Sequence, residues 1–244
     1  MAYTAFELLA LLIVTCGIML QTWVGIGFGL LAAPLLYLIN PAYVPGPILI
    51  LGFSLSLLVV LKEHRNLRWQ RIMPAIIARL PGSWCGAALL VAVPQYTLSL
   101  LFGASLLLAV LITWSACQLT TTRLSLTIGG FFSGLIGTAT SVGGPPMALV
   151  YQETDRITAR NELAAFFLIG TPISIIMLLL QGSIDMTSLT LSMKMLPGLF
   201  LGFWLANKLD GSINTASAKP VLLLISSASA LMVLYKGIQG WLAA

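Results

Sequence analysis

The chain has 244 residues, of which 59% are hydrophobic and 8% are charged, with a formal net charge of +5. An average soluble protein is about half apolar and roughly one-quarter charged, so this composition excludes a soluble protein and indicates an all-α integral membrane protein. Most of the positive charge lies in short polar stretches, where orienting the protein in the membrane is a sufficient explanation for it.

Eight apolar segments follow one another along the chain. They span residues 5–39, 44–61, 72–93, 97–119, 124–151, 163–181, 186–207 and 217–240. Most of them have about the 20 residues that a helix needs to cross a bilayer. The polar TTTR run ending at Arg123 separates the fourth segment from the fifth. We therefore predict two transmembrane repeats, residues 1–122 and 123–244, within one membrane domain.

The fifth segment is not built like an ordinary membrane helix. Residues 129–151 read GGFFSGLIGTATSVGGPPMALVY. Pro145 and Pro146 lack N–H donors and clash with the preceding turn, so a helix running from Thr138 to Gly144 should break there. In a bilayer, irregular backbone persists only where it is buried in protein or lines a wet cavity. The interruption therefore predicts a binding site.

A similar stretch occurs in the first half of the chain. At an offset of 112, the first-half residues Gly17, Gly25 and Pro34 fall on Gly129, Gly137 and Pro146. At an offset of 116, LPGSWCGAAL starting at Leu80 falls on LPGLFLGFWL starting at Leu196. Matches in the same order in both halves favour an internal repeat, which is how many transporters are built.

The basic residues indicate how the two halves are oriented. If all eight segments cross once, the loop lysines and arginines divide six to four between the two sides. If segments 5–39 and 124–151 instead return to their starting side, nine lie together and only Lys236 lies opposite, which satisfies the positive-inside rule. We therefore predict two inverted four-segment repeats, each opening with a broken or re-entrant helix hairpin, and both termini outside.

Two basic residues, Arg79 and Lys194, lie inside apolar segments, each just before the LPG motif of its half. A basic side chain at bilayer depth costs at least about 3 kcal/mol unless it is paired or wet, so both are candidates for anion binding. The alternative is that their long stems carry the charge to the membrane surface.

The broken stretches offer polar groups to an anion. Hydroxyls and exposed backbone N–H groups cluster just before the proline pair, and a half-helix starting there would add the positive end of its dipole. The first half supplies a more apolar wall. The glycines have a simpler explanation as close-packing GxxxG pairs. The candidate substrate-binding residues are Gln21, Gly25, Gly27, Gly29, Arg79, Gly137, Thr138, Thr140, Ser141, Gly143, Gly144 and Lys194.

One carboxylate, Glu162, lies at the start of the sixth apolar segment. It has two interpretations. It neutralises Arg156 or Arg160 at the membrane edge, or it carries protons, as intramembrane carboxylates commonly do.

Motifs of enzymes and of nucleic-acid binders are absent from the sequence. There is one histidine, and there is no HExxH, GxSxG or P-loop pattern. The three cysteines show no metal-ligand spacing. We expect no catalysis, no metal, no cofactor and no nucleic-acid partner.

The chain resembles the sulfite exporter TauE/SafE (TSUP) family over nearly its whole length. The resemblance rests on GIGFGLLAAPLL at residues 25–36, SGLIGTATSVGGPPMALV at residues 133–150, and the LPGxxxG motif in each half. It implies export of small sulfur-containing anions, such as sulfite, sulfoacetate or other organosulfonates, across a bacterial inner membrane.

We therefore predict an alternating-access carrier that holds its anion between the two broken-helix tips. Two alternatives remain at this stage: an anion channel of the same architecture, and a membrane scaffold that transports nothing. Homo-oligomerisation, the coupling ion and the exact substrate are left open.

Overall fold

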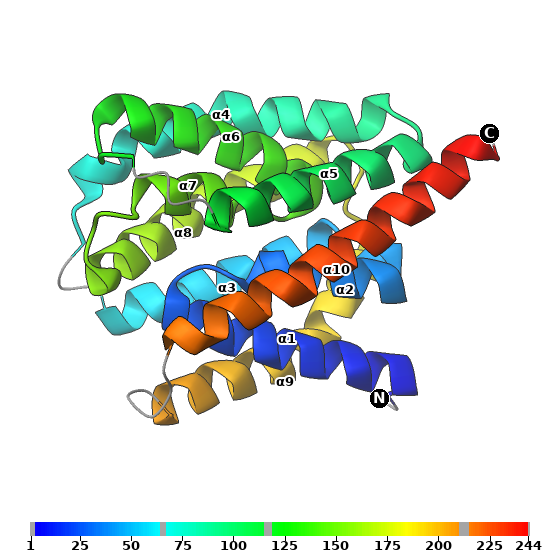
Figure 1. Ribbon diagram of the computed structural model, residues 1–244, viewed down its shortest axis with the longest axis horizontal. Helices are drawn as coiled ribbons and strands as arrows, with labels where there is room; N and C mark the ends of the chain where they lie inside the picture. The colour runs from blue at the N-terminus through cyan, green and yellow to red at the C-terminus, as the bar shows by residue number, and fades with distance from the viewer. Residues whose placement is uncertain (1–2, 64–66, 115–118, 210–214, 244) are drawn as a thin grey trace.

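The computed structural model describes residues 3–63, 67–114, 119–209 and 215–243 (Figure 1). These residues form helices and connecting turns, with no strand among them. The helices are α1 (Ala5–Val24), α2 (Phe28–Ile39), the short 3-10 helix η1 (Pro41–Tyr43), α3 (Gly46–Glu63), α4 (Trp69–Ala92), α5 (Gln95–Trp114), α6 (Arg123–Thr140), α7 (Gly144–Val150), α8 (Arg156–Leu180), α9 (Met186–Lys208) and α10 (Thr215–Leu242).

Seven helices of the described residues are long and apolar enough to cross a membrane: α1, α3, α4, α5, α8, α9 and α10. Their lengths match the thickness of a hydrocarbon core, and they confirm a multi-pass membrane protein. The shorter helices α2 and α7 lie in the middle of the bundle, whereas α4 packs on α6 along one edge and α1 packs on α9 along the other (Figure 1).

Both predicted interruptions are present, at the ends of α1 and α6. Gly25 follows α1 with φ 87° and Ser141 follows α6 with φ 64°, so each helix stops at a left-handed residue. In the second half, Pro145 and Pro146 lie in the first turn of α7, where a missing N–H costs nothing. In the first half, Pro34 lies inside α2, so the glycines rather than this proline mark the break.

The helix ends recur at one offset. Helices α1 and α6 end 116 residues apart, at Val24 and Thr140, and so do α4 and α9, at Ala92 and Lys208. Helices α2 and α7 also begin 116 residues apart, at Phe28 and Gly144. This is the offset of the LPG motif. The offset of 112 pairs Gly25 with Gly137, which lies within α6, so the recurring glycines there mark close packing and not the break itself.

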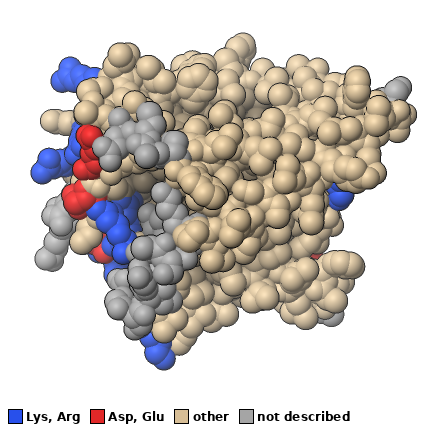
Figure 2. Space-filling model, in the orientation of Figure 1, with Lys and Arg blue, Asp and Glu red and all other residues tan. Residues whose placement is uncertain are grey.

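Most of the charged side chains visible in Figure 2 gather at one end of the bundle, on the left. Arg160 of α8 pairs with Glu63 at the end of α3, with 3.0 Å between Nη2 and Oε1. Arg156 donates to the carbonyl oxygen of Trp23 near the end of α1. Glu63 and Arg71 therefore lie at the same end of the bundle as Arg160 and Glu162, which agrees with the distribution of basic residues.

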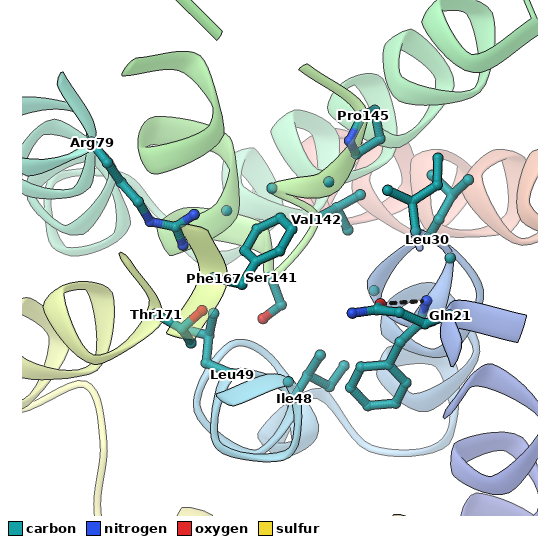
Figure 3. Close-up of a pocket in the computed structure, with 18 residues that line it drawn as sticks. Gln21, Leu30, Ile48, Leu49, Arg79, Ser141, Val142, Pro145, Phe167 and Thr171 are labelled. Atoms are coloured by element: carbon teal, nitrogen blue, oxygen red, sulfur yellow. Dashed lines mark hydrogen bonds between the residues drawn. The ribbon is translucent and has the colours of Figure 1, made fainter. Parts of the chain in front are cut away.

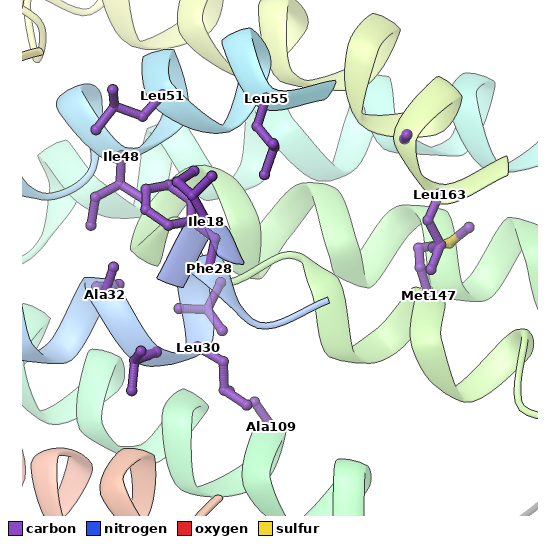
Figure 4. Close-up of a cluster of buried hydrophobic side chains, with 14 of the residues drawn as sticks. Ile18, Phe28, Leu30, Ala32, Ile48, Leu51, Leu55, Ala109, Met147 and Leu163 are labelled. Carbon is purple, nitrogen blue, oxygen red and sulfur yellow. The ribbon is translucent and has the colours of Figure 1, made fainter. Parts of the chain in front are cut away.

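A hydrophobic core surrounds α2 and fixes its position (Figure 4). Phe28 and Leu30 of α2 are each 2% exposed, and they belong to the same buried cluster as Ile18 of α1 and Ile48 and Leu55 of α3. Inside a membrane, close van der Waals packing of such side chains holds the helices together, because lipid tails are as apolar as they are. The start of α2 is thereby held in the centre of the protein.

Candidate functional site

The two helix breaks meet in the middle of the bundle. A Cβ atom at Gly29, in the first turn of α2, would lie only 2.5 Å from the carbonyl oxygen of Ser141. Ile26 of the first break similarly lies beside Gly144, because a Cβ atom at Gly144 would be 3.6 Å from Ile26 Cγ2. The absence of a side chain at Gly29 therefore allows the first broken helix to touch the second.

A cavity of about 50 Å³ lies between the two breaks (Figure 3). At about 10–15 Å³ per water position, it has room for only a few small groups. Its walls come from both breaks and from α3, α4 and α8. The lining residues are Gln21, Ile26, Gly27, Phe28, Gly29, Leu30, Ile48, Leu49, Gly52, Arg79, Gly137, Ser141, Val142, Gly143, Gly144, Pro145, Phe167 and Thr171.

Arg79 is the basic residue of this cavity. It lies on α4, is only 1% exposed, and extends its guanidinium group toward the cavity (Figure 3). Its Nη1 atom donates to Ser133 Oγ at 3.2 Å, and its Nη2 atom donates to Ser174 Oγ at 3.3 Å. Its Nε atom has no hydrogen-bond partner among the described residues.

The surroundings of Arg79 are shaped to hold a guanidinium group. Its Cζ atom lies 4.9 Å from the ring centre of Phe166 and 5.3 Å from that of Phe167, within cation–π distance of both. Gly170 leaves the space that the side chain fills, because a Cβ atom there would lie 2.3 Å from Arg79 Cδ. The position of the cation is thus fixed by packing.

Among the described residues, Arg79 has no carboxylate partner. The ion pairs in that part of the chain include Arg71–Glu162, Arg160–Glu63 and Lys194–Glu7. Taking an ion out of water costs several kcal/mol, and two hydroxyl groups do not carry the opposite charge that would offset this cost. The site therefore carries a buried positive charge that an anion in the cavity would neutralise.

Hydroxyl groups behind Arg79 are connected to one another. Ser174 Oγ lies 2.8 Å from Thr138 Oγ1, which donates to it, and 3.2 Å from Ser83 Oγ. Ser133 Oγ donates to the carbonyl oxygen of Gly143 at 2.6 Å, which ties α6 to the second break. These contacts couple the position of the guanidinium group to the geometry of the break.

Gln21 and Ser141 hold the two breaks in place. Gln21 Oε1 accepts a hydrogen bond from the backbone N–H of Phe28 at 3.0 Å, so the first turn of α2 is capped by this side chain (Figure 3). Ser141 Oγ donates to the carbonyl oxygen of Pro45 at 2.9 Å. The prolines at the start of α7 offer no N–H, so fewer backbone donors face the cavity than the sequence suggests.

Eight of the candidate residues line this cavity: Gln21, Gly27, Gly29, Arg79, Gly137, Ser141, Gly143 and Gly144. The other four do not. Gly25 packs against the backbone of Arg160, and Thr138 bonds to Ser174 behind the cavity. Thr140 Oγ1 donates to the carbonyl oxygen of Ile136 in its own helix.

Lys194 lies apart from the cavity. Its Nζ atom pairs with a carboxylate oxygen of Glu7, in the first turn of α1. The two cations predicted from the sequence are therefore not brought together. Arg79 contributes to the cavity, whereas the charge of Lys194 is neutralised by Glu7.

Ser133, Ser174 and Gly170 are the neighbours of Arg79 that the sequence does not single out. A serine in a membrane helix commonly bonds to a carbonyl oxygen of its own helix, as Ser56 and Ser192 do here. The residue type alone does not distinguish these two roles. Only the packing of α6 and α8 on α4 brings both hydroxyls to the guanidinium group.

A second hollow, of about 200 Å³, lies between the cavity and the charged end of the bundle. We call it the vestibule. It shares Ile26 and Pro145 with the cavity and extends to Gln152, Thr154 and Arg156. Ile26 and Pro145 therefore form the partition between the two spaces.

Glu162 lies fully buried near the charged end, on α8. Its Oε2 atom is 3.6 Å from Arg71 Nε, and the Arg71 guanidinium group also lies over the ring of Tyr151 at 5.9 Å. The sequence suggested Arg156 or Arg160 as its partner, but Arg160 pairs with Glu63 and the ion-pair partner of Glu162 is Arg71. Neither carboxylate oxygen makes a hydrogen bond within the described residues.

The start of α8 is fixed by Asp155. Its carboxylate accepts a hydrogen bond from the backbone N–H of Thr158 at 2.9 Å, and this bond lowers the pKa of Asp155. The cap stays ionised at neutral pH and orients the first turn, which carries Arg156 and Arg160.

Among the described residues, no group of three or more His, Cys, Asp and Glu side chains is arranged to hold a metal ion. The family model described as "Sulfite exporter TauE/SafE" matches residues 9–233 of the chain. Comparison with curated proteins gives no match, and comparison with solved structures gives none either.

Proposed function

Because this chain belongs to the sulfite exporter TauE/SafE family, we propose that it transports sulfite, or another sulfur oxoanion of similar size, out of the cell across the inner membrane of a bacterium. The observation that carries this proposal is the buried Arg79 cation, which borders the cavity between the two helix breaks and has no carboxylate partner in the part of the chain that the structure describes. A cationic cavity deep in a membrane protein of this family suits a small anion.

Arg79 is the residue that would recognise the substrate. A guanidinium group is planar and presents parallel N–H donors, which match two oxygens of a sulfur oxoanion. Its Nε atom, now without a partner, would gain an acceptor. Ser133 and Ser174 then keep the group aligned, and Gln21 and Ser141 preserve the geometry of the two breaks.

The size of the cavity favours the smallest members of the substrate class. Its volume of about 50 Å³ leaves room for a single sulfur atom and its oxygens. Sulfoacetate and taurine add a carbon chain with a second polar group. Such substrates would have to displace Ile26 and extend into the vestibule.

The mechanism we propose is alternating access between two inverted repeats, residues 1–122 and 123–244. Two features support it. The helix ends recur 116 residues apart, and each half opens with a helix broken at the cavity. In this mechanism the partition of Ile26 and Pro145 opens toward the charged end, the anion binds at Arg79, and the two repeats rock to open the opposite side.

Two driving forces are compatible with this mechanism. The anion moves outward down its own gradient and the inside-negative potential, which is worth about 2.3 kcal/mol per charge per 100 mV. Alternatively, Glu162 carries a proton in exchange, because it is a buried carboxylate whose oxygens make no hydrogen bond in the described part of the chain.

Calorimetric titration of the purified protein with sulfite, sulfate, sulfoacetate and taurine tests the proposal. We expect saturable binding that is strongest for sulfite. Binding of none of the four would overturn the transport function and leave the membrane scaffold. An anion channel would conduct in a planar bilayer without saturating, and the closed partition at Ile26 and Pro145 favours a carrier.

A further inference from the structure

A long groove on the outer face of the bundle, between α4 and α6, suggests a second ligand. It consists of two adjoining hollows of about 690 and 940 Å³ that share Gln70, Pro74 and Arg123. The first lies at the charged end of the bundle. The second continues along the two helices to Pro81 of α4 and Phe132 of α6.

The groove arises because the two helix backbones approach very closely. A Cβ atom at Gly82 would lie 2.1 Å from the carbonyl oxygen of Phe131, and one at Gly130 would lie 2.3 Å from that of Ala75. Close contact of this kind is typical of membrane helices that meet at small residues. Longer side chains then stand on either side of the contact line and form the walls of the groove.

One hollow of the groove is mainly apolar, and the other is basic. The long hollow is lined by apolar side chains that stay exposed, such as Ile77 at 59% and Phe132 at 48%. The hollow at the charged end is lined by Arg68, Arg71 and Arg123. Of these, only Arg71 takes part in an ion pair within the described residues.

The length of the groove matches one leaflet of a membrane. From Gln70 to Pro81 the α4 axis rises about 16 Å, at 1.5 Å per residue, close to half of the roughly 30 Å hydrocarbon core. The arginines lie near the first residues of α4 and α6, at the end where headgroups meet the protein. Trp69 lies beside them, as tryptophan commonly does at a membrane interface.

We propose that this groove, which we call the α4/α6 groove, binds a phospholipid with an anionic headgroup. The phosphate lies among Arg68, Arg71 and Arg123, and an acyl chain lies along Ile77, Phe132 and their neighbours. Basic pockets between membrane helices are suited to anionic headgroups. A second copy of the chain fits less well, because it would bring like-charged arginines together. This proposal does not depend on what the central cavity binds.

Native mass spectrometry of the detergent-purified protein tests the site. The protein is titrated with phosphatidylglycerol, with phosphatidylcholine of the same acyl chains, and with phosphatidylglycerol in the presence of excess inorganic phosphate. We expect one tightly bound phosphatidylglycerol, weaker binding of phosphatidylcholine, and little competition by phosphate. The double variant Arg68→Gln, Arg123→Gln should lose roughly fivefold in affinity per arginine, which corresponds to about 1 kcal/mol per basic residue near an anionic surface.

The matched control is Lys62→Gln, Lys208→Gln, which removes the same charge from the same end of the bundle but outside the groove. It should bind phosphatidylglycerol as the wild type does. The variant Ile128→Trp, which fills the apolar part, should weaken both lipids. Gel filtration and circular dichroism show whether each variant is folded.

Three results would overturn the lipid site. Equal binding of the two lipids would show that the arginines do not distinguish an anionic headgroup from a neutral one. Full competition by inorganic phosphate would identify a site for a small anion. A dimer that dissociates in the Ile128→Trp variant would show that a second copy of the chain occupies the groove.

Discussion

Arg79 lies so close to Gly170 that a Cβ atom at position 170 would come within 2.3 Å of Arg79 Cδ. The guanidinium group therefore reaches the cavity only because α8 has no side chain at this point. A glycine on one helix thus positions the cation on another.

Substituting Gly170→Ala should displace Arg79 from the cavity. We expect at least a tenfold loss of sulfite affinity in calorimetric titration, together with the roughly 1–3 kcal/mol that overpacking costs in stability. The matched control is Gly103→Ala, where a Cβ atom would lie 2.5 Å from Leu234 Cγ. This contact between α5 and α10 does not line the cavity. The control should lose stability and keep its affinity. Unchanged affinity in a folded Gly170→Ala protein would contradict the role of Gly170.

Replacing Arg79 itself distinguishes charge from geometry. Hydrogen bonds to a charged group contribute about 1.5–3 kcal/mol, so Arg79→Gln should weaken sulfite binding by roughly ten- to a hundredfold. Arg79→Lys keeps the charge but loses the planar fork, so it should recover only part of the affinity. Lys208→Gln, at the charged surface, serves as the control for net charge. If Arg79→Gln bound sulfite as the wild type does, Arg79 would not belong to the site.

Lys194→Gln separates the two cations that the sequence predicts for the site. Because Lys194 pairs with Glu7 and does not line the cavity, we expect sulfite affinity to stay within about twofold of the wild type. The partly exposed pair should contribute little to stability. A loss of affinity as large as that of Arg79→Gln would instead bring Lys194 into the binding site in another conformation.

Shortening Ile26 should open the partition toward the vestibule. An apolar constriction controls passage by excluding water, so Ile26→Ala should raise the rate of radiolabelled sulfite exchange in proteoliposomes several-fold with little change in equilibrium affinity. Leu149→Ala, which lines only the vestibule, is the comparison. An Ile26→Ala protein that binds sulfite and exchanges it at the wild-type rate would rule out this gate.

Glu162→Gln tests proton exchange. The amide keeps the size of the side chain but carries no proton, so net sulfite export by Glu162→Gln should no longer drive the proton movement that a pH-sensitive dye reports in wild-type proteoliposomes. Glu63→Gln removes another paired carboxylate at the same end and should keep this proton movement. Wild-type proton movement in Glu162→Gln would leave the membrane potential and the anion gradient as the driving force.

Much of the fold follows from local properties of the chain. The apolar runs predict the membrane-spanning helices because hydrocarbon thickness fixes their length. Pro145 and Pro146 predict the second break because they remove backbone N–H donors. The first break is predicted only from the similarity of the stretch from Gly25 to Pro34 to the second. The structure places the first break at Gly25 and Gly27, which have positive φ, and Pro34 is accommodated within α2.

Partners of buried side chains could not be predicted in the same way. Arg79 and Lys194 precede the same motif in the two halves, so their sequence environments are alike. Nevertheless, Arg79 bonds to Ser133 and Ser174, whereas Lys194 pairs with Glu7 near the start of the chain. These contacts join residues 54, 95 and 187 positions apart.

The sequence by itself determined that this is a multi-pass helical membrane protein with two interrupted helices and one basic end, because hydropathy, backbone chemistry and loop charge each act over a few neighbouring residues. Only the tertiary structure decided that the two interruptions touch at Gly29 and Ser141 and that one of the two cations reaches the cavity between them. The reason is that helix packing selects which side chains meet, and this selection depends on glycines in other helices, such as Gly170, that no local pattern identifies.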